Sequence, residues 1–353
     1  MVVGGCQLSV IQCRTLDMTN RPPTTDGLLI IDKPAAWTSH DVVAKVRKLC
    51  GTRRVGHTGT LDPFATGVLV ICLNRATRLV QFLTSEDKEY LATIRFGFAT
   101  DTGDLTGTML SPEMSPAHLN DTLIERAFAP FRGCLTQIPP MYSAKKIGGV
   151  KLYEMARRGE QIERPPIAIE IKHLSLVTPL QHDECTIRVT CSAGTYIRTL
   201  AEDIGKQLGI GAHLTQLRRT RAGKCELSRA RTLEQLAALL DADKLSDAVI
   251  PMAEALVWPE LQVSEVETEM IAHGRSIKRA GAWQVGQQLK LMRDRDLLAV
   301  ALNERFSDCD ARSARTDDAI AVRKLTRHNM LPNNLPTRLT VSSYTATCNF
   351  KIW

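Results

Sequence analysis

Short apolar segments predict a series of β-strands between residues 27 and 250. Residues 28–31 and 68–73 are continuous apolar runs of the kind that buried strands contain. Residues 90–96 also read as a strand. Residues 167–171 and 185–191 alternate apolar with polar side chains, which predicts strands with one buried face.

Apolar residues spaced by three and four predict helices between these strands. One stripe covers residues 42–49, and Ser39 or Asp41 can cap that helix at its N-terminus. Further stripes lie near residues 76–83, 123–131 and 197–208, the last of which ends at Gly209. Because strands and helices do not alternate regularly, the order predicts an α+β domain with a largely antiparallel central sheet.

The pattern divides the chain into a main domain and three other segments. Residues 27–250 form the main domain, whereas residues 1–26 lack periodicity and are expected to be a disordered N-terminal extension. A small second unit is predicted for residues 251–310, with a helix followed by strand-like residues at 289–301. Residues 311–353 lose the pattern, and we treat them as a tail of unknown structure.

The composition is that of a globular protein. Hydrophobic residues make up 44% of the chain and charged residues 24%. No apolar run reaches the ~20 residues that a membrane helix needs, and the pattern of a secretory signal is missing. We therefore expect a cytoplasmic protein without a membrane partner. The ten cysteines never stand at the short spacing of zinc-ligand pairs, so we expect reduced thiols and no bound metal.

Basic residues gather in three parts of the sequence, although the formal net charge is only +7. Residues 45–54 contain five lysines and arginines and no acid. Two further clusters lie at residues 145–158 and 218–231. Any one cluster can be an ordinary solvated surface. Three clusters around one polar loop favour a partner with a phosphate backbone.

The stretch from Val55 to Gly67 concentrates the candidate chemistry. It places His57 and Asp62 among glycines and threonines, between two apolar segments. Glycines allow another molecule to approach the backbone closely, and Pro63 fixes the backbone directly after the acid. An Asp-Pro pair in such a loop is most often a simple turn. The alternative is an active-site loop that presents the Asp62 carboxylate.

Several separate motifs in one order favour the active-site loop. They occupy residues 27–34, 55–67, 87–90, 100–104, 139–145, 191–199 and 212–219. Together they resemble the TruB family of tRNA pseudouridine synthases, in which the aspartate of the Leu-Asp-Pro string is catalytic. Any one motif would be weak evidence, but their shared order is specific. The resemblance covers residues 27–250 and is weaker beyond them.

The resemblance implies a fold, a reaction and a substrate. The expected fold is the pseudouridine synthase fold, with a central mixed sheet, followed at residues 251–310 by a small PUA-like RNA-binding domain. The expected reaction converts uridine to pseudouridine in the T-loop of tRNA, at position 55, on a base flipped out of its stack. No cofactor is expected. The partner would be the tRNA T-arm, bound by a monomer that needs no other protein.

The resemblance also assigns three catalytic roles. Asp62 matches the catalytic aspartate, Arg198 the arginine that keeps it ionised and oriented, and Tyr196 a tyrosine near C5 of the base. Asp62 can act as nucleophile or base, and the sequence leaves open which atom it attacks or deprotonates. Taken alone, Arg198 is equally a surface arginine at a helix start, and Tyr196 a core tyrosine.

A second group of residues is expected to bind the substrate. Tyr90 matches the aromatic that stacks on the target base, Leu217 closes the pocket floor, and Lys33 supports the site. His57 matches the histidine that takes the place of the flipped base, although a lone histidine in a glycine-rich loop is more often only solvated. The remaining members of this set are the basic residues Arg78, Arg218 and Arg219.

Two other functions are compatible with the same motifs. One is a related synthase that modifies ribosomal RNA with a guide RNA and protein partners, and the other is an RNA-binding chaperone that folds tRNA. Residues 136–164 resemble the thumb-like RNA-binding insertion of standalone bacterial members, which favours the standalone enzyme over the guide-dependent one. Product formation by the purified protein on unmodified tRNA would separate these two.

Overall fold

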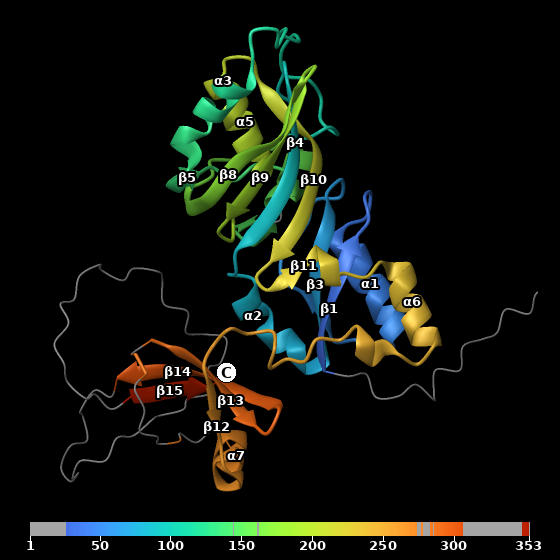
Figure 1. Cartoon of the computed structure of the whole chain (residues 1–353), viewed down its shortest axis with the longest axis vertical. Coiled ribbons are helices and arrows are strands. Elements are labelled where there is room, and N and C mark those ends of the chain that lie inside the picture. The colour runs from blue at the N-terminus through green and yellow to red at the C-terminus, as the bar shows by residue number, and fades with distance from the viewer. Residues whose placement is uncertain are drawn as a thin grey trace, which may run out of the picture.

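The computed structural model describes residues 26–305 and 348–352, except for positions 144, 161, 274–276, 278–282 and 285. The predicted N-terminal extension, apart from residue 26, lies outside the described residues, as does most of the predicted tail. Figure 1 shows a large mixed domain with a smaller sheet beside it. No helix within these ranges is long and apolar enough to cross a membrane.

A nine-stranded sheet forms the centre of the main domain (Figure 1). Its strands are β1 (Gly27–Lys33), β2 (Val55–His57), β3 (Thr66–Leu73), β4 (Lys88–Phe96), β5 (Gly133–Gln137), β8 (Ile167–Gln181), β9 (Glu184–Cys191), β10 (Ala212–Ala222) and β11 (Cys225–Glu226). The order is β1-β3-β10-β4-β9-β8-β5, with β2 paired to β3 and β11 to β10. All pairings are antiparallel except the short parallel contact between β3 and β10. The predicted α+β class with a mixed, largely antiparallel sheet is confirmed.

Helices cover both halves of this sheet. The main ones are α1 (Ser39–Cys50), α3 (Asp121–Ala127), α5 (Ile197–Gln207) and α6 (Leu233–Asp241). The shorter elements are η1 (Asn74–Leu79), α2 (Val80–Leu83), η2 (Ala129–Phe131), η3 (Leu227–Arg229) and η4 (Leu245–Asp247). The helix predicted near residues 76–83 is thus divided between a 3₁₀ turn and one α-helical turn.

The parallel contact between β3 and β10 joins two halves of the sheet that have separate cores. In the first half, Leu29 and Ile31 pack with α1 and α6, whereas Leu28 and Ile30 belong to a cluster on the opposite face. Burial on both faces explains the continuous apolar runs. In the second half, β4 and β9 bury alternate residues in a cluster that includes α5, which explains their alternating pattern. The active-site candidates lie where these halves meet.

The start of α1 differs from the prediction. Thr38 is the N-cap, because its hydroxyl accepts a hydrogen bond from the Asp41 backbone nitrogen at 3.1 Å and the Asp41 carboxylate accepts one from the Thr38 nitrogen at 2.9 Å. The two residues form a capping box. Ser39 therefore does not serve as a cap, and its buried hydroxyl contacts the Asp62 loop instead.

The second sheet contains β12 (Glu260–Gln262), β13 (Gln288–Arg293), β14 (Asp296–Arg305) and β15 (Cys348–Ile352), and α7 (Glu265–Ala272) lies beside it. β15 falls in the segment that the sequence left as a tail of unknown structure, and it pairs antiparallel with β14. Met292, Leu297 and Val300 join the same buried cluster as Leu28 and Ile30 of the main domain. The small sheet therefore packs directly against the large one.

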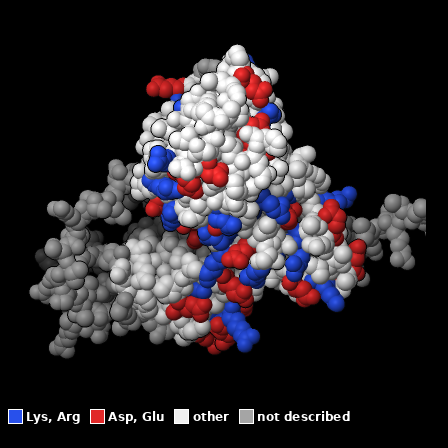
Figure 2. Space-filling view, turned by 45° about the horizontal axis from the view of Figure 1, so that its top comes forward, with Lys and Arg blue, Asp and Glu red and all other residues white. Residues whose placement is uncertain are grey.

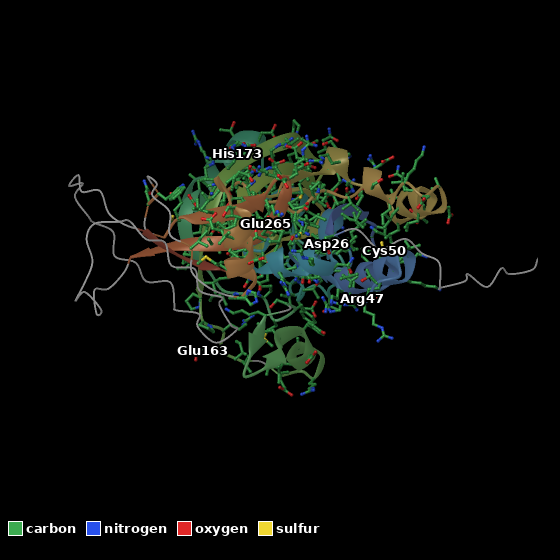
Figure 3. The ribbon with its side chains drawn as sticks, turned by 90° about the horizontal axis from the view of Figure 1, so that it is seen from below. Asp26, Arg47, Cys50, Glu163, His173 and Glu265 are labelled. Atoms are coloured by element: carbon green, nitrogen blue, oxygen red, sulfur yellow. The ribbon has the colours of Figure 1, made fainter. Side chains whose placement is uncertain are left out.

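An insertion separates β5 from β8. It contains the hairpin strands β6 (Lys146–Ile147) and β7 (Val150–Lys151), followed by α4 (Leu152–Arg157). Figure 3 shows this segment, near the labelled Glu163, projecting from one side of the molecule.

Candidate active site

Three buried side chains from separate elements fix the loop that carries Asp62. Ser39 of α1 accepts a hydrogen bond from the backbone nitrogen just before Asp62, at 2.9 Å. Lys33 of β1 donates to the carbonyl oxygen just after it, at 3.1 Å. Arg219 of β10 donates to a carbonyl oxygen three residues before it, at 3.1 Å. Because each of the three residues is at most 2% exposed, the loop is anchored to the folded core.

Gly67 allows this loop to return to the sheet. Its φ is +98°, and a Cβ at this position would lie 2.2 Å from the carbonyl oxygen of Arg219. Gly67 is paired with Arg219 in the parallel contact between β3 and β10. Only glycine adopts this φ without strain while leaving room for the neighbouring strand. The glycine that ends the motif therefore has a structural explanation.

Asp62 and Arg198 form a two-pronged ion pair. The Arg198 Nε lies 2.9 Å from Asp62 Oδ2, and its Nη2 donates to Oδ1 at 3.2 Å. The guanidinium also donates to the carbonyl oxygens of Thr102 at 2.8 Å and Tyr142 at 2.6 Å. The buried carboxylate of Asp104 lies 3.7 Å from Nη1. This planar group, fixed at several points, holds the Asp62 carboxylate in one orientation.

Opposing effects act on the Asp62 carboxyl. Burial raises its pKa above the ordinary value for aspartate, Arg198 lowers it, and the nearby Asp104 carboxylate raises it again, so that the net direction is upward. A carboxylate with a raised pKa is a better proton acceptor than a free aspartate. Arg198 limits the rise and keeps the ionised form accessible.

Tyr196 directly precedes α5, and Gln137 of β5 holds its backbone. The Gln137 amide donates to the Tyr196 carbonyl oxygen at 2.9 Å and accepts from the Tyr196 nitrogen at 2.8 Å. Burial raises the pKa of the Tyr196 hydroxyl, so the phenol stays protonated at neutral pH. Sequence reasoning gave no role to Gln137, because a polar residue at the end of a strand has no local signal of a long-range partner.

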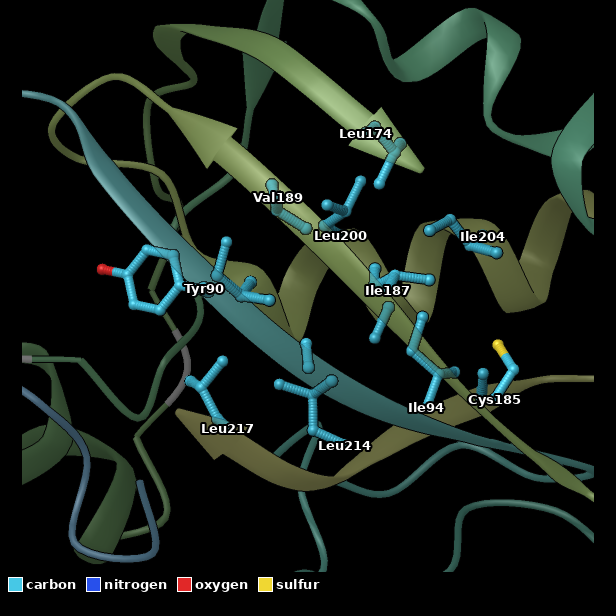
Figure 4. Close-up of a cluster of buried hydrophobic side chains, with 14 of the residues drawn as sticks. Tyr90, Ile94, Leu174, Cys185, Ile187, Val189, Leu200, Ile204, Leu214 and Leu217 are labelled. Carbon is cyan, nitrogen blue, oxygen red and sulfur yellow. The ribbon is translucent and has the colours of Figure 1, made fainter. Parts of the chain in front are cut away.

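A cavity of about 260 Å³ opens beside Asp62. Its lining includes Tyr90, Leu217, Tyr196 and Lys88. Figure 4 shows Tyr90 and Leu217 at one end of the large buried cluster, with the Tyr90 hydroxyl directed away from it. An aromatic face and an aliphatic side chain beside a carboxylate suit a planar ring with polar edges. A second cavity of about 580 Å³ also borders Asp62.

His57 lies beside His40 at the edge of the loop, with ring centroids 5.9 Å apart and the rings nearly perpendicular. Burial lowers the pKa of His57, and the neighbouring His40 and Arg219 lower it further, so the neutral ring is favoured at pH 7. His57 does not line either cavity next to Asp62. The structure therefore places it near the site but outside the space beside the carboxylate.

The three predicted substrate-binding arginines occupy different environments. Arg218 is partly exposed and forms an ion pair with Asp32 at 2.6 Å. Arg219 was expected to face RNA phosphates, but it is 2% exposed and donates to backbone carbonyls, although it lines the smaller cavity. Strand alternation explains this difference, because neighbouring residues of β10 point to opposite faces. Arg78 is exposed and borders a separate small cavity against the second sheet.

Charged residues are mixed on the surface near these elements. On the face shown in Figure 2, lysines and arginines gather in the lower half together with aspartates and glutamates, and the upper part carries fewer charges. Arg53 and Arg54 of the first basic cluster are exposed. In the part of the chain that the structure describes, no group of three or more His, Cys, Asp or Glu could hold a metal ion.

Three further residues of the site received no role from the sequence. Asp104 lies in the motif at residues 100–104 and Ser143 in the motif at residues 139–145. Membership of these motifs is the sequence feature that indicates a place in the site. Lys88 lies in the same motif as Tyr90; it is buried beside the smaller cavity and donates to two backbone carbonyls. Burial lowers the pKa of Lys88 to about 8.

Comparisons with known proteins show which family the chain is similar to. Residues 47–197 match the model of the TruB family pseudouridylate synthase N-terminal domain, and residues 198–257 match that of the tRNA pseudouridylate synthase B C-terminal domain. The chain is 45% identical to tRNA pseudouridine synthase B of Solibacter usitatus over 251 residues, which cover 71% of this chain and 85% of that protein. The Thermobifida fusca protein of the same name is 44% identical over 266 residues, covering 72% and 88%.

Solved structures show the same fold. A chain in the crystal structure of a Cbf5-Nop10-Gar1 complex has a TM-score of 0.63 at 27% identity, covering 79% of this chain and 78% of that one. A chain of an H/ACA RNP bound to a substrate RNA containing 2'-deoxyuridine has a TM-score of 0.62 at 25% identity, covering 80% and 79%. The chain described here therefore belongs to the TruB family of pseudouridylate synthases and has the pseudouridine synthase fold.

Proposed function

We propose that this protein isomerises uridine to pseudouridine in the T-loop of tRNA, at position 55, with Asp62 as the catalytic carboxylate. The observation that carries the proposal is the oriented Asp62–Arg198 ion pair beside an aromatic-lined cavity in a member of this family. Relatives covering most of the chain are named tRNA pseudouridine synthase B, which supports tRNA as the substrate.

The reaction needs few components. The N1–C1′ bond of uridine breaks, the uracil turns, a C5–C1′ bond forms, C5 loses its proton and N1 gains one, so that atoms and electrons balance without redox chemistry. Asp62 can start this sequence as nucleophile or base, and Arg198 holds the carboxylate ionised and in one orientation. No metal or organic cofactor is needed for these steps.

The cavity residues hold the base while it is detached. Tyr90 offers an aromatic face for stacking, and Leu217 closes the apolar floor. Tyr196, whose phenol is protonated at neutral pH, is placed by the resemblance near C5, where it can assist proton removal. A uridine in folded tRNA must leave its stack to reach Asp62, and His57 is the candidate for the vacated place.

The parts outside the cavity would bind the rest of the tRNA. The exposed basic residues 53–54 and the projecting insertion at residues 136–164 suit a phosphate backbone. We assign the same role to the unit at residues 251–310, as a PUA-like domain. The protein would act as a cytoplasmic monomer on the T-arm. The insertion favours this standalone reading over a guide-RNA-dependent synthase.

Asp62→Asn tests the proposal. This substitution keeps the shape of the side chain but removes its charge, so tritium release from C5-labelled uridine in tRNA should fall to background. Affinity for tRNA, measured by filter binding, should change little, because the basic surface is untouched. Asp183→Asn is the matched control, since Asp183 forms a partly exposed ion pair with Arg95 at 2.6 Å and lines neither cavity beside Asp62. This control should retain turnover.

The same assay distinguishes the rivals. Turnover by the purified protein alone on unmodified tRNA would exclude a requirement for a guide RNA or a protein partner. A protein that refolds tRNA but releases no tritium would instead be the RNA chaperone. Substantial tritium release by Asp62→Asn would remove Asp62 from the mechanism, and equal loss of binding and release would make it a structural residue.

A further inference from the structure

Ser143 carries a buried hydroxyl group that no other described residue satisfies. Its Oγ makes no hydrogen bond within the described ranges, and the residue is only 5% exposed. The backbone around it is fixed, because the Ser143 nitrogen donates to the Met141 carbonyl at 2.9 Å and its carbonyl accepts from the Tyr153 nitrogen at 3.1 Å. An unsatisfied buried hydroxyl is unfavourable, and one in a residue that borders a cavity can be satisfied by a bound partner.

The position of Ser143 indicates where that partner binds. Ser143 lines both cavities beside the carboxylate, and Asp62 and Arg198 do the same. Burial raises the pKa of the Tyr196 hydroxyl, and the nearby Ser143 hydroxyl lowers that pKa. No hydrogen bond of ordinary length joins the two hydroxyls. Ser143 therefore lies at the border of the space proposed for the target base.

Other strong donors around the smaller cavity already have partners. Arg198 bonds to Asp62 and to two backbone carbonyls. Arg219 donates to two backbone carbonyls, and Lys88 donates to two more. A uracil that enters the cavity leaves water and brings two carbonyl oxygens that need donors. The Ser143 hydroxyl makes no hydrogen bond of ordinary length to the residues described, and the Tyr196 hydroxyl is the group nearest to competing for it.

We propose that the Ser143 hydroxyl donates a hydrogen bond to a carbonyl oxygen of the target uracil and so helps to hold the base after its bond to the sugar breaks. This role rests on the proposed function and deepens it. Ser143 acts as a substrate contact, and no covalent bond forms or breaks at its oxygen. Because Ser143 belongs to the insertion, the contact would also join the insertion to the reacting base.

Ser143→Ala and Thr215→Val form a matched pair for testing this role. Thr215 on β10 also has a buried hydroxyl without a partner among the described residues, but it lines neither cavity. Full-length variants are compared on tRNA for kcat/KM and for thermal unfolding. Ser143→Ala should lower kcat/KM by about threefold to tenfold, the effect of one neutral hydrogen bond. Thr215→Val should leave kcat/KM unchanged, and both variants should unfold no earlier than the wild-type protein.

Thiouridines at the target position identify the contact itself. Sulfur is a weaker hydrogen-bond acceptor than oxygen. Of 2-thiouridine and 4-thiouridine, the analogue whose sulfur replaces the contacted carbonyl oxygen should therefore lower the turnover of the wild-type protein. Ser143→Ala should lose little more with that same analogue, since the two changes remove one interaction. Effects that multiply for both analogues, or full activity of Ser143→Ala, would overturn the inference. An inactive wild-type protein would instead refute the proposed function, and the inference with it.

Discussion

Arg198→Lys tests the division of work within the ion pair, because lysine keeps the positive charge but loses the planar fork. In the structure the guanidinium makes two contacts with Asp62, at 2.9 and 3.2 Å. It also donates to two backbone carbonyls, at 2.8 and 2.6 Å. A single ammonium group cannot reach all of these partners from one point.

The size of the effect follows from the contacts that lysine cannot replace. Each hydrogen bond to a charged group contributes about 1.5–3 kcal/mol. The Asp62 side chain is 32% exposed, so water compensates for part of the loss. For about two lost contacts we expect the activation free energy to rise by about 2–4 kcal/mol, which lowers kcat/KM about 30-fold to 1,000-fold. Affinity for tRNA should stay nearly constant.

The pH dependence gives an independent check on the same pair. Arg198 lowers the pKa of Asp62 against the effect of burial. Arg198→Met removes this influence, so the pKa of Asp62 should rise further and the ionised fraction should be lost at a higher pH during acidification. The acid limb of the kcat/KM profile should therefore move to higher pH in Arg198→Met, and less in Arg198→Lys.

The assay is tritium release from C5-labelled uridine in tRNA across a pH series, beside filter binding. Arg95→Lys is the control, since Arg95 makes a partly exposed ion pair with Asp183 at 2.6 Å, lines neither cavity beside Asp62 and should retain wild-type kinetics. An unshifted acid limb in Arg198→Met, or full activity of Arg198→Lys at neutral pH, would refute the reasoning that Arg198 sets the ionisation and orientation of Asp62.

Three further predictions concern stability, RNA binding and the C-terminal sheet. Burial lowers the pKa of Lys33 to about 8. Between pH about 8 and about 10.4, the unfolded chain therefore binds a proton at Lys33 that the folded chain lacks. The free energy of unfolding should rise with pH in this range. Denaturant unfolding should show this rise to be smaller in Lys33→Met, and equal slopes would exclude it. Replacing the exposed Arg53 or Arg54 with alanine should lower the salt dependence of tRNA affinity by about one phosphate contact in each case. An unchanged salt slope in filter binding would exclude that contact. Replacing the buried Arg219 with alanine should mainly reduce stability. Ending the chain after Arg305 should preserve turnover, because the residues that line the two cavities lie between positions 38 and 219. Thermal scans of this short form should show lower stability, since β14 loses its pairing with β15. A short form that is folded but inactive would show that β15 is needed for catalysis.

The sequence by itself determined much of the local structure. The continuous apolar runs at residues 28–31 and 68–73 became strands buried on both faces, and the alternating run at residues 185–191 became a strand with one buried face. The stripe over residues 42–49 became α1. These features depend on the periodicity of side chains within one element, which neighbouring residues record directly. Motif order was also sufficient to indicate the family.

The residue pattern alone does not tell which motif residues meet; the family resemblance implied the Asp62–Arg198 pair, and the tertiary structure brings the two side chains together. Asp62 and Arg198 are separated by 136 positions, and their contact depends on the arrangement of the Asp62 loop and the start of α5 across the sheet. The same arrangement buries Arg219 beneath the loop and leaves Arg78 beside the second sheet. Both are arginines in polar stretches, and a basic residue has the same local pattern whether it faces RNA or a buried carbonyl. Long-range pairing of strands distinguishes these cases, because it sets the face on which each side chain lies.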